Sequence, residues 1–345
     1  MKKHFHLLFF LAAVLTLTGC GDSSSTGPDE TIERASAERQ FIWNAMNFWY
    51  FWQSNVPELA DNGQFFENEQ AFQNFLMSFS DERALFQSLL YTQEDDFSFF
   101  IDDFEVFMQS QQGISKSFGF RFGLVQISGT NDVFGYVQFV NPDSPADNAG
   151  LKRGDIFRGV NGVRLNINNF QSALSGDNYD LIMAVIQDGS IVETGETVQV
   201  QAVTLQTDPV FRASVLETGS AKVGYLKYNS FQRNSHERLN DVFAMFDAEG
   251  INELVVDLRY NGGGSVTTSN ALATMISGLD NSSEFARFTF NSKRSDLNDP
   301  VFFLNQLPIF NDEGQQTGQI PINKLSINRV IFLTGFGTPS ASETL

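Results

Sequence analysis

Apolar residues change their spacing along this chain, and the changes divide it into regions. Over residues 32–110 they recur at helical spacing, as Phe41, Ile42 and Ala45 do. Aromatic side chains are dense there, above all in the run of five from Phe48 to Trp52. We expect a small helical domain whose aromatic side chains pack in its core rather than bind a ligand.

Residues 111–205 show a different pattern, with short alternating runs separated by turn residues. Val133–Val140 predicts a strand, and residues 141–146 predict a turn into a short helix that ends at Gly150. A Gly-Asp turn at residues 154–155 and an Asn-Gly hairpin at residues 161–162 follow. This region is predicted to be a β-rich domain.

The last region, residues 206–345, alternates strands and helices. We expect a strand at 223–231, a helix that shows Leu239, Val242 and Phe243 on one face and ends at residues 249–250, a strand at 254–259 and a helix at 267–276. An apolar strand then reaches residue 333, and a helix begins close to the last residue, Leu345. The order predicts an α/β core, so the whole chain is of the α/β multidomain class.

The first nineteen residues carry the pattern of a secretory signal peptide. Lys2 and Lys3 precede a mostly apolar run over residues 7–17, which is too short to span a membrane. The next residues, Leu17-Thr18-Gly19-Cys20, resemble the bacterial lipobox, which implies a lipidated Cys20. The alternative is an ordinary signal peptide with a chance cysteine. Residues 20–31 are polar and turn-rich, as a flexible tether would be.

Charge and composition exclude several classes of function. The formal net charge of −19 makes nucleic acid and anionic membrane surfaces poor partners, so the membrane is reached through the lipid anchor only. Cys20 is the one cysteine, and His236 is the one histidine after the signal peptide. A Ser-His-Asp triad would therefore depend on His236, and we expect no metal site and no cofactor.

Three glycines, residues 262–264, follow the buried strand at 254–259 and precede a helix. Backbone must approach something closely at this edge, or adopt positive φ. A phosphate cradle is one alternative, but the run has neither a Gly-Lys-Ser/Thr ending nor Gly-x-Gly-x-x-Gly spacing. An oxyanion hole built from backbone N–H groups fits the pattern better.

The second candidate segment is Ser340-Ala341-Ser342-Glu343, at the predicted start of a helix. Backbone N–H groups at such a start favour developing negative charge. Ser340 with Glu343 three residues later is also the pattern of a capping box, which needs no chemistry. The sequence alone leaves both interpretations open.

Together, Asp257-Leu258-Arg259-Tyr260-Asn261-Gly262-Gly263-Gly264 and the later Ser-Ala-Ser-Glu run resemble the carboxyl-terminal processing, or tail-specific, proteases of peptidase family S41. The resemblance implies an S41 core of the ClpP/crotonase type, with Ser340 as nucleophile. It also implies that the Ala341 and Gly263 amides form the oxyanion hole and that Glu343 helps to order the site. In that family a lysine after the serine is the general base.

No lysine of this chain follows Ser340, so we expect the base to lie beyond Leu345, the core to be truncated after the nucleophile, and the chain as it stands to be inactive. Lys227, on a core strand, is the one alternative base within the chain, although a solvated strand position is its expected role.

The turn residues of 111–205 resemble, in order and spacing, the PDZ domains of bacterial processing proteases. Such domains add an extended peptide to a sheet edge and hold its terminal carboxylate with loop amides. Gly119 and Phe120 match that loop, although Gly119 could equally serve only to permit a tight strand entry.

These patterns predict a lipid-anchored serine endopeptidase of the bacterial cell envelope, in the periplasm or at the outer membrane. Its partners would be proteins or peptides with free or unstructured C-termini, cleaved through an acyl-enzyme. The alternative is a noncatalytic peptide-binding lipoprotein on a protease-like fold.

Overall fold

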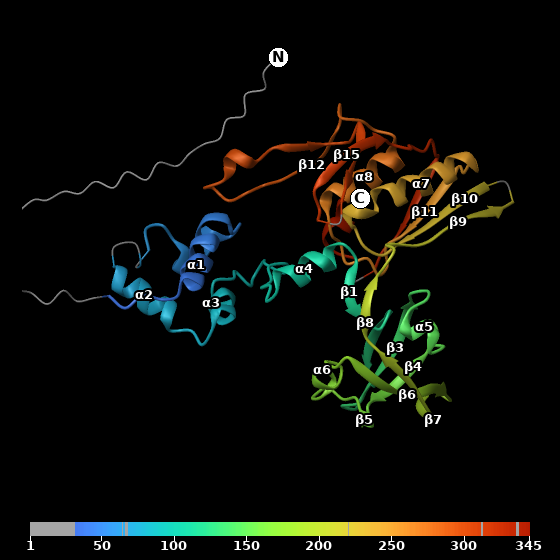
Figure 1. The fold of residues 1–345 in the computed structure, drawn as a ribbon, viewed down its shortest axis with the longest axis horizontal. Coiled ribbons are helices and arrows are strands. Elements are labelled where there is room, and N and C mark those ends of the chain that lie inside the picture. Colours follow the sequence, from blue (N-terminus) through green and yellow to red (C-terminus); the bar gives the residue numbers. More distant parts are fainter. Residues whose placement is uncertain (1–31, 64, 66–67, 220, 312, 336–337) are drawn as a thin grey trace, which may run out of the picture. The chain divides into compact units, whose positions relative to one another are not determined.

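The computed structural model describes residues 32–63, 65, 68–219, 221–311, 313–335 and 338–345 (Figure 1). The chain forms two compact units, which divide between Asp95 and Asp96. The predicted signal peptide, Cys20 and the tether up to residue 31 lie outside the described residues.

The first unit is helical, as expected. It contains α1 (Ala37–Trp49), α2 (Glu69–Met77) and α3 (Glu82–Ser88), with short 3₁₀ turns at Gln53–Asn55 and Pro57–Leu59. A side-chain oxygen caps the start of each α-helix, from Ser36, Asn68 and Asp81 respectively. These caps satisfy N–H groups that the first turn of a helix leaves without a partner.

The expectation that the aromatic side chains of this unit pack in its core is wrong for several of them. Trp43 and Tyr50 are buried, because they share one face of α1 and its end. Phe41 is 70% exposed and Trp49 is 50% exposed, because helical spacing directs them away from that face. Helix α1 therefore carries more aromatic side chains than its one buried face can accommodate.

The second unit begins with α4 (Phe104–Gln111) and β1 (Ile114–Ser117), which pairs antiparallel with β8 (Val203–Gln206). Between β1 and β8 the chain forms an antiparallel sheet of order β2-β3-β4-β6-β7, with the short β5 paired to β4. Its elements are β2 (Phe120–Gln126), β3 (Val133–Val140), α5 (Pro145–Asn148), β4 (Ile156–Val160), β5 (Val163–Arg164), α6 (Phe170–Ala173), β6 (Asn178–Gln187) and β7 (Ser190–Gln201). Strand β2 is thus an edge strand.

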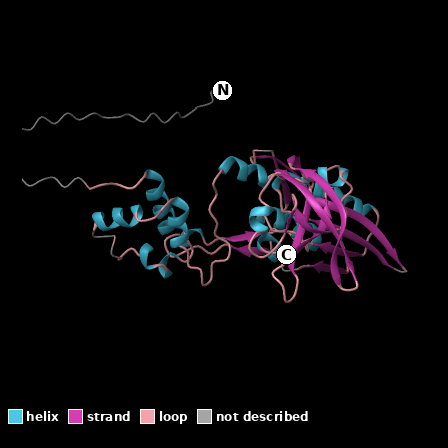
Figure 2. Cartoon of the chain, turned by 90° about the horizontal axis from the view of Figure 1, so that it is seen from below, coloured by secondary structure: helices cyan, strands magenta, loops and turns pink. Residues whose placement is uncertain are grey.

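The remainder of the unit is an α/β layer built on the sheet β16-β11-β10-β9 (Figure 2). The strands are β9 (Val210–Thr218), β10 (Ala221–Tyr228), β11 (Glu253–Asp257) and β16 (Arg329–Leu333). Strands β10, β11 and β16 are parallel to one another, and β9 is antiparallel to β10. Helices α7 (His236–Ala248) and α8 (Val266–Ser277) bury apolar faces in the same core as Leu226, Leu254 and Val256.

Two antiparallel ribbons between α8 and β16 were not expected from the sequence. They are β12 (Glu284–Arg287) with β13 (Pro300–Phe302), and β14 (Gln306–Phe310) with β15 (Gln316–Pro321). A short 3₁₀ turn, Ser295–Leu297, lies within the first of them. The described chain ends in a 3₁₀ helix, Ser340–Thr344, where the sequence predicted the start of a longer helix.

The β-rich domain between β1 and β8 requires glycine at position 135. A β-carbon added at Gly135 would lie 2.0 Å from the ring of Phe157, which is fully buried. We expect Gly135→Ala to destabilise the domain by about 1–3 kcal/mol, because the ring must leave its packed position. Urea unfolding followed by circular dichroism measures the change.

Gly176→Ala in the same domain is the matched control, since the nearest atom to its added carbon is 3.9 Å away. The control should shift stability by no more than about 0.5 kcal/mol. Equal unfolding curves for the two variants would contradict the packing described here.

Candidate active site

The candidate site lies where two neighbouring parallel strands end. Strands β11 and β16 run in the same direction, so the segments that follow them leave from the same edge of the sheet. The N–H of Leu258 donates to the carbonyl of Leu333 at 2.8 Å, and the Thr338 hydroxyl donates to the carbonyl of Leu258 at 2.9 Å. These bonds hold the glycine-rich loop beside the segment that carries Ser340.

Gly263 and Ser340 meet at the centre of this edge. A β-carbon added at Gly263 would lie 2.7 Å from the β-carbon of Ser340 and 3.0 Å from its Oγ. The φ of Gly263 is also +96°, which side-chain-bearing residues rarely adopt. Both the contact and the backbone angle therefore require glycine, and the two segments singled out from the sequence come together.

Ser340 has a strained backbone and an exposed hydroxyl. Its φ of 63° lies in the left-handed region, which costs energy for a residue other than glycine and recurs at functional sites. Its N–H donates to Oε2 of Glu343 at 3.2 Å, which is one half of a capping box. The other half is not made, because Pro339 is the cap residue and Oγ of Ser340 has no hydrogen bond within the described residues. The hydroxyl is therefore not used as a helix cap.

Two backbone N–H groups near Ser340 have no acceptor in the described part of the chain. One is the amide of Ala341, whose side chain is buried. The other is that of Gly264. The carbonyl of Gly263 accepts from Phe231 N at 3.0 Å, and in a planar trans peptide the Gly264 N–H points the opposite way, away from Phe231.

The amide of Gly263, which the sequence suggested for the oxyanion hole, is already engaged. It donates to Oδ1 of Asn261 at 2.8 Å. The N–H of Gly264, the next glycine along the loop, has no acceptor among the described residues.

Asn261 is a positioning residue that the sequence analysis did not single out. Its side chain is fully buried and also donates from Nδ2 to the carbonyl of Tyr228 at 3.0 Å. Its backbone carbonyl accepts from the hydroxyl of Ser342 at 3.5 Å. Asn261 thus ties the glycine loop both to β10 and to the segment of Ser340. The sequence feature that could have identified Asn261 is its position directly before the three glycines.

An ion pair between Arg259 and Asp257 stabilises the end of β11, where the glycine loop begins. The Arg259 guanidinium donates from Nε and Nη2 to the two oxygens of Asp257, at 2.9 and 2.7 Å, and the Tyr225 hydroxyl donates to Oδ2 at 2.7 Å. Burial opposes ionisation of Asp257, but these donors outweigh it and hold the pKa of the carboxyl below its usual value. The end of β11 is therefore fixed by an ionised, fully bonded carboxylate.

Tyr260, on the same loop, contacts the β-rich domain. Arg121 of β2 donates from Nη1 to the Tyr260 carbonyl at 2.5 Å, and Arg153 donates from Nη1 to its hydroxyl at 3.0 Å. The loop is thus bonded to an edge strand of the neighbouring domain as well as to the core.

Lys227 is buried rather than solvated, so the expected role is wrong. It is 8% exposed, and its Nζ lies 4.2 Å from the ring centroid of Phe211, 4.8 Å from that of Phe139 and 5.1 Å from that of Tyr260. Burial lowers the pKa of Lys227 to about 8, while the carboxylate of Asp257 opposes the shift. Aromatic residues from both domains close over the strand, which periodicity within β10 could not reveal.

His236 does not belong to this site. It is buried at the start of α7, with Nδ1 2.6 Å from the Pro308 carbonyl and Nε2 2.8 Å from Oγ1 of Thr268. Burial lowers its pKa. Both ring nitrogens therefore have structural partners.

Gly119 and Phe120 lie at the entry to β2. The N–H of Gly119 donates to the Ser117 hydroxyl at 3.0 Å, and a β-carbon at Gly119 would lie 2.0 Å from that of Ser144. The close approach by itself requires glycine. Capture of a carboxylate by this amide would have to displace the Ser117 hydroxyl.

Within the described residues, no group of three or more histidine, cysteine, aspartate or glutamate side chains is placed to hold a metal ion. No helix in that part of the chain combines the length and the apolar character needed to cross a lipid bilayer.

Family models match three parts of the chain in order. Residues 37–99 match the peptidase S41 N-terminal domain, residues 136–188 match a PDZ domain, and residues 222–345 match peptidase family S41. The model of the peptidase domain thus includes the glycine loop and Ser340.

Curated relatives and a solved structure agree with these matches. Carboxyl-terminal-processing peptidase 2 of Arabidopsis thaliana is 26% identical over 59% of this chain, and the carboxyl-terminal-processing protease of Picosynechococcus is 24% identical over 39% of it. The matches span 41% and 33% of those relatives' own lengths. An S41 protease of Bacteroides fragilis shares the fold, with a TM-score of 0.61 and 24% identity over 88% of this chain and 73% of its own.

The buried amine of Lys227 predicts a specific pH dependence of stability. Its pKa is about 8 in the folded chain and returns towards 10.5 on unfolding, so the unfolded state binds more protons between these pH values and stability rises with pH across that window. Lys227→Met should remove roughly 2 kcal/mol of this rise and stabilise the fold near pH 7. Urea unfolding at pH 7 and pH 10.5 measures both effects.

Lys222→Met is the matched control, because Lys222 lies on the same strand with an exposed side chain. Its pH profile should follow that of the parent. A Lys227→Met profile parallel to the parent's would contradict the burial of this amine.

Proposed function

Because the chain carries the N-terminal, PDZ and peptidase domains of family S41, we propose that it is a serine endopeptidase that acts through Ser340. Its substrates would be proteins or peptides with free or unstructured C-termini. The observation that carries this proposal is the meeting of Gly263 and Ser340, in which the serine has positive φ and a hydroxyl with no partner within the described residues.

The reaction would proceed through an acyl-enzyme. Oγ of Ser340 loses its proton to a base and bonds to the carbonyl carbon of the scissile peptide, whose oxygen becomes an oxyanion. The N–H groups of Ala341 and Gly264 would donate to that oxyanion. The proton then passes to the leaving amine as the C–N bond breaks, and water hydrolyses the ester to release Ser340.

The choice of Gly264 departs from the expectation of Gly263. It is supported by the bond from Gly263 N to Asn261, which leaves the next amide along the loop available. Glu343 would hold the backbone of Ser340 in its strained form through the 3.2 Å bond to its N–H.

A neutral lysine would serve as the base. Lys227 has a lowered pKa, but its amine is enclosed by the rings of Phe139, Phe211 and Tyr260, and no bond joins it to Ser340 in the described residues. We therefore assign the base to a lysine other than Lys227.

The PDZ domain would deliver the substrate. Strand β2 lies at the edge of its sheet, so an extended peptide can pair with it, and Gly119 and Phe120 stand at the end where a terminal carboxylate would bind. Lipidation of Cys20 would tether the enzyme to the cell envelope, in the periplasm or at the outer membrane, and give it extracytoplasmic targets.

A noncatalytic peptide-binding lipoprotein is the second candidate. The observation that favours it is the lack of any base bonded to Ser340 within the described residues. A sequence read through the codon after Leu345 separates the two: a lysine in a glycine-flanked loop supports the peptidase, and a stop codon supports the binder.

Replacement of Ser340 tests the nucleophile. In the protein as its full gene encodes it, Ser340→Ala should reduce cleavage of a disordered peptide by at least about a thousandfold, because the acyl-enzyme cannot form. Mass spectrometry of the products measures the rate.

Ser342→Ala is the matched control, since Ser342 lies two residues further and its hydroxyl donates only to the carbonyl of Asn261. It should retain cleavage within about tenfold, as expected for loss of one weak structural hydrogen bond. Turnover that persists in Ser340→Ala would refute the assignment.

A further inference from the structure

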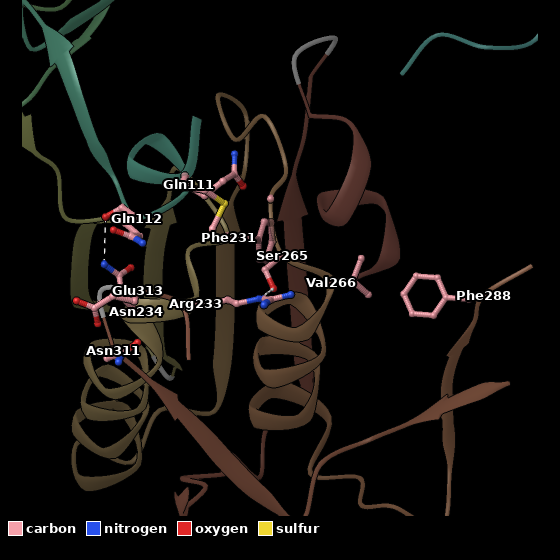
Figure 3. A pocket seen from close by; sticks show the side chains of 13 residues that line it. Gln111, Gln112, Phe231, Arg233, Asn234, Ser265, Val266, Phe288, Asn311 and Glu313 are labelled. Atoms are coloured by element: carbon pink, nitrogen blue, oxygen red, sulfur yellow. Dashed lines mark hydrogen bonds between the residues drawn. The ribbon is translucent and has the colours of Figure 1, made fainter. Parts of the chain in front are cut away.

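A cavity of about 440 Å³ opens beside the glycine loop, on the side of Phe231 (Figure 3). Its wall includes Gly264, Ser265 and Val266, which directly follow the loop glycine that contacts Ser340, and Met108 of α4. The volume is that of a site for a small ligand or a short piece of peptide. Nothing in the arrangement of Ser340 and the loop amides uses this space.

Arg233, an exposed residue, places a positive charge at the cavity wall. Its Nε donates to the Ser265 hydroxyl at 3.1 Å, and its Cζ lies 5.6 Å from the ring centroid of Phe310. Figure 3 shows the guanidinium lying against Ser265. No carboxylate in the described part of the chain forms an ion pair with Arg233, so its Nη donors remain available.

The surroundings of Arg233 divide the cavity into two ends. Towards one end lie the apolar side chains of Val266 and Phe288, and towards the other lie Asn234, Asn311 and Glu313 (Figure 3). The start of α8 at Val266, which has no side-chain cap, adds positive potential near the guanidinium. The negative charge of Glu313, at the polar end of the cavity, reduces this positive potential.

The polar end also holds an unmet hydrogen-bond acceptor. Asn234 donates from Nδ2 to the Gln112 carbonyl at 3.1 Å, but its Oδ1 is buried with no donor among the described residues. The bond to Gln112 holds Asn234 in the polar wall of the cavity.

We propose that this cavity is a substrate subsite in which Arg233 binds a carboxylate of the peptide while Val266 and Phe231 pack on apolar atoms beside it. The carboxylate would belong either to an acidic side chain near the scissile bond or to the free C-terminus of a short leaving fragment. A guanidinium whose Nη donors are available can bind a planar carboxylate with two parallel hydrogen bonds. The inference rests on the proposed function, since it takes Ser340 as the point of cleavage.

Equilibrium binding tests this subsite without requiring turnover. Four fluorescein-labelled, unstructured decapeptides carry an internal Glu or Gln and end in an amide or a free carboxylate. Fluorescence anisotropy at low salt on the full chain should give about tenfold tighter binding for a carboxylate-bearing peptide than for the Gln amide. Arg233→Gln should reduce that preference to less than twofold, and Arg233→Lys should retain part of it.

Two further variants control for charge. Arg212→Gln removes an exposed arginine that does not line the cavity and should keep the preference. Glu313→Gln removes the opposing charge and should tighten binding of the carboxylate peptides two- to threefold. Circular dichroism confirms that each variant is folded.

The pattern over the four peptides identifies the source of the carboxylate. A preference for internal Glu that Arg233→Gln removes assigns the site to an acidic side chain, and a preference for the free end that Arg233→Gln removes assigns it to the C-terminus. Identical binding of all four peptides by the parent and Arg233→Gln would overturn the proposal, as would a free-end preference alone that survives the substitution, since the PDZ domain would then account for it.

Ser340→Ala separates this inference from the proposed function. It should leave the preference unchanged even if it removes all cleavage. Cleavage by the protein as its full gene encodes it, without any binding preference, would refute the subsite alone. A preference without cleavage by that protein would refute the proposed function alone.

Discussion

The parallel pairing of β11 with β16 is the constraint on which the candidate site depends. Because the two strands run in the same direction and are neighbours, the glycine loop after one and the serine segment after the other must leave from one edge of the sheet. The bond from Thr338 to the Leu258 carbonyl then fixes the second segment against the first. Segments far apart in sequence become a single site through backbone hydrogen bonds.

The glycine loop and the serine segment approach each other closely at that edge of the sheet, which restricts the residue types that both segments can contain. Gly263 has no room for a side chain beside Ser340, and Asn261 fills the space behind the loop with an amide that bonds both to β10 and to the loop. The bond from Gly263 N to Asn261 occupies the Gly263 N–H, whereas that of Gly264 has no acceptor among the described residues. The hydrogen bond from the Ser340 N–H to Glu343 stabilises the positive φ of Ser340. The geometry of the serine therefore depends on the identity of the neighbouring residues as well as on the serine.

Much of this was predictable from local sequence, and the rest depended on tertiary contacts. The strand before the glycines and helix α8 followed from periodicity, and the resemblance to family S41 implied that the glycine loop and Ser340 form one site. The engaged amide of Gly263 and the burial of Lys227 did not, because the first depends on one side-chain rotamer and the second on rings from two domains. The aromatic composition of the first unit led to the opposite error. It predicted that Phe41 and Trp49 are buried, whereas both are exposed.

The most direct test of the central claim is a crystal structure of the protein, as its full gene encodes it, with a peptide boronic acid. The account predicts a covalent bond from Oγ of Ser340 to boron, with one boronate oxygen within hydrogen-bond distance of the Ala341 and Gly264 amides. A boronate bonded to another residue, or one whose oxygen faces neither amide, would contradict it.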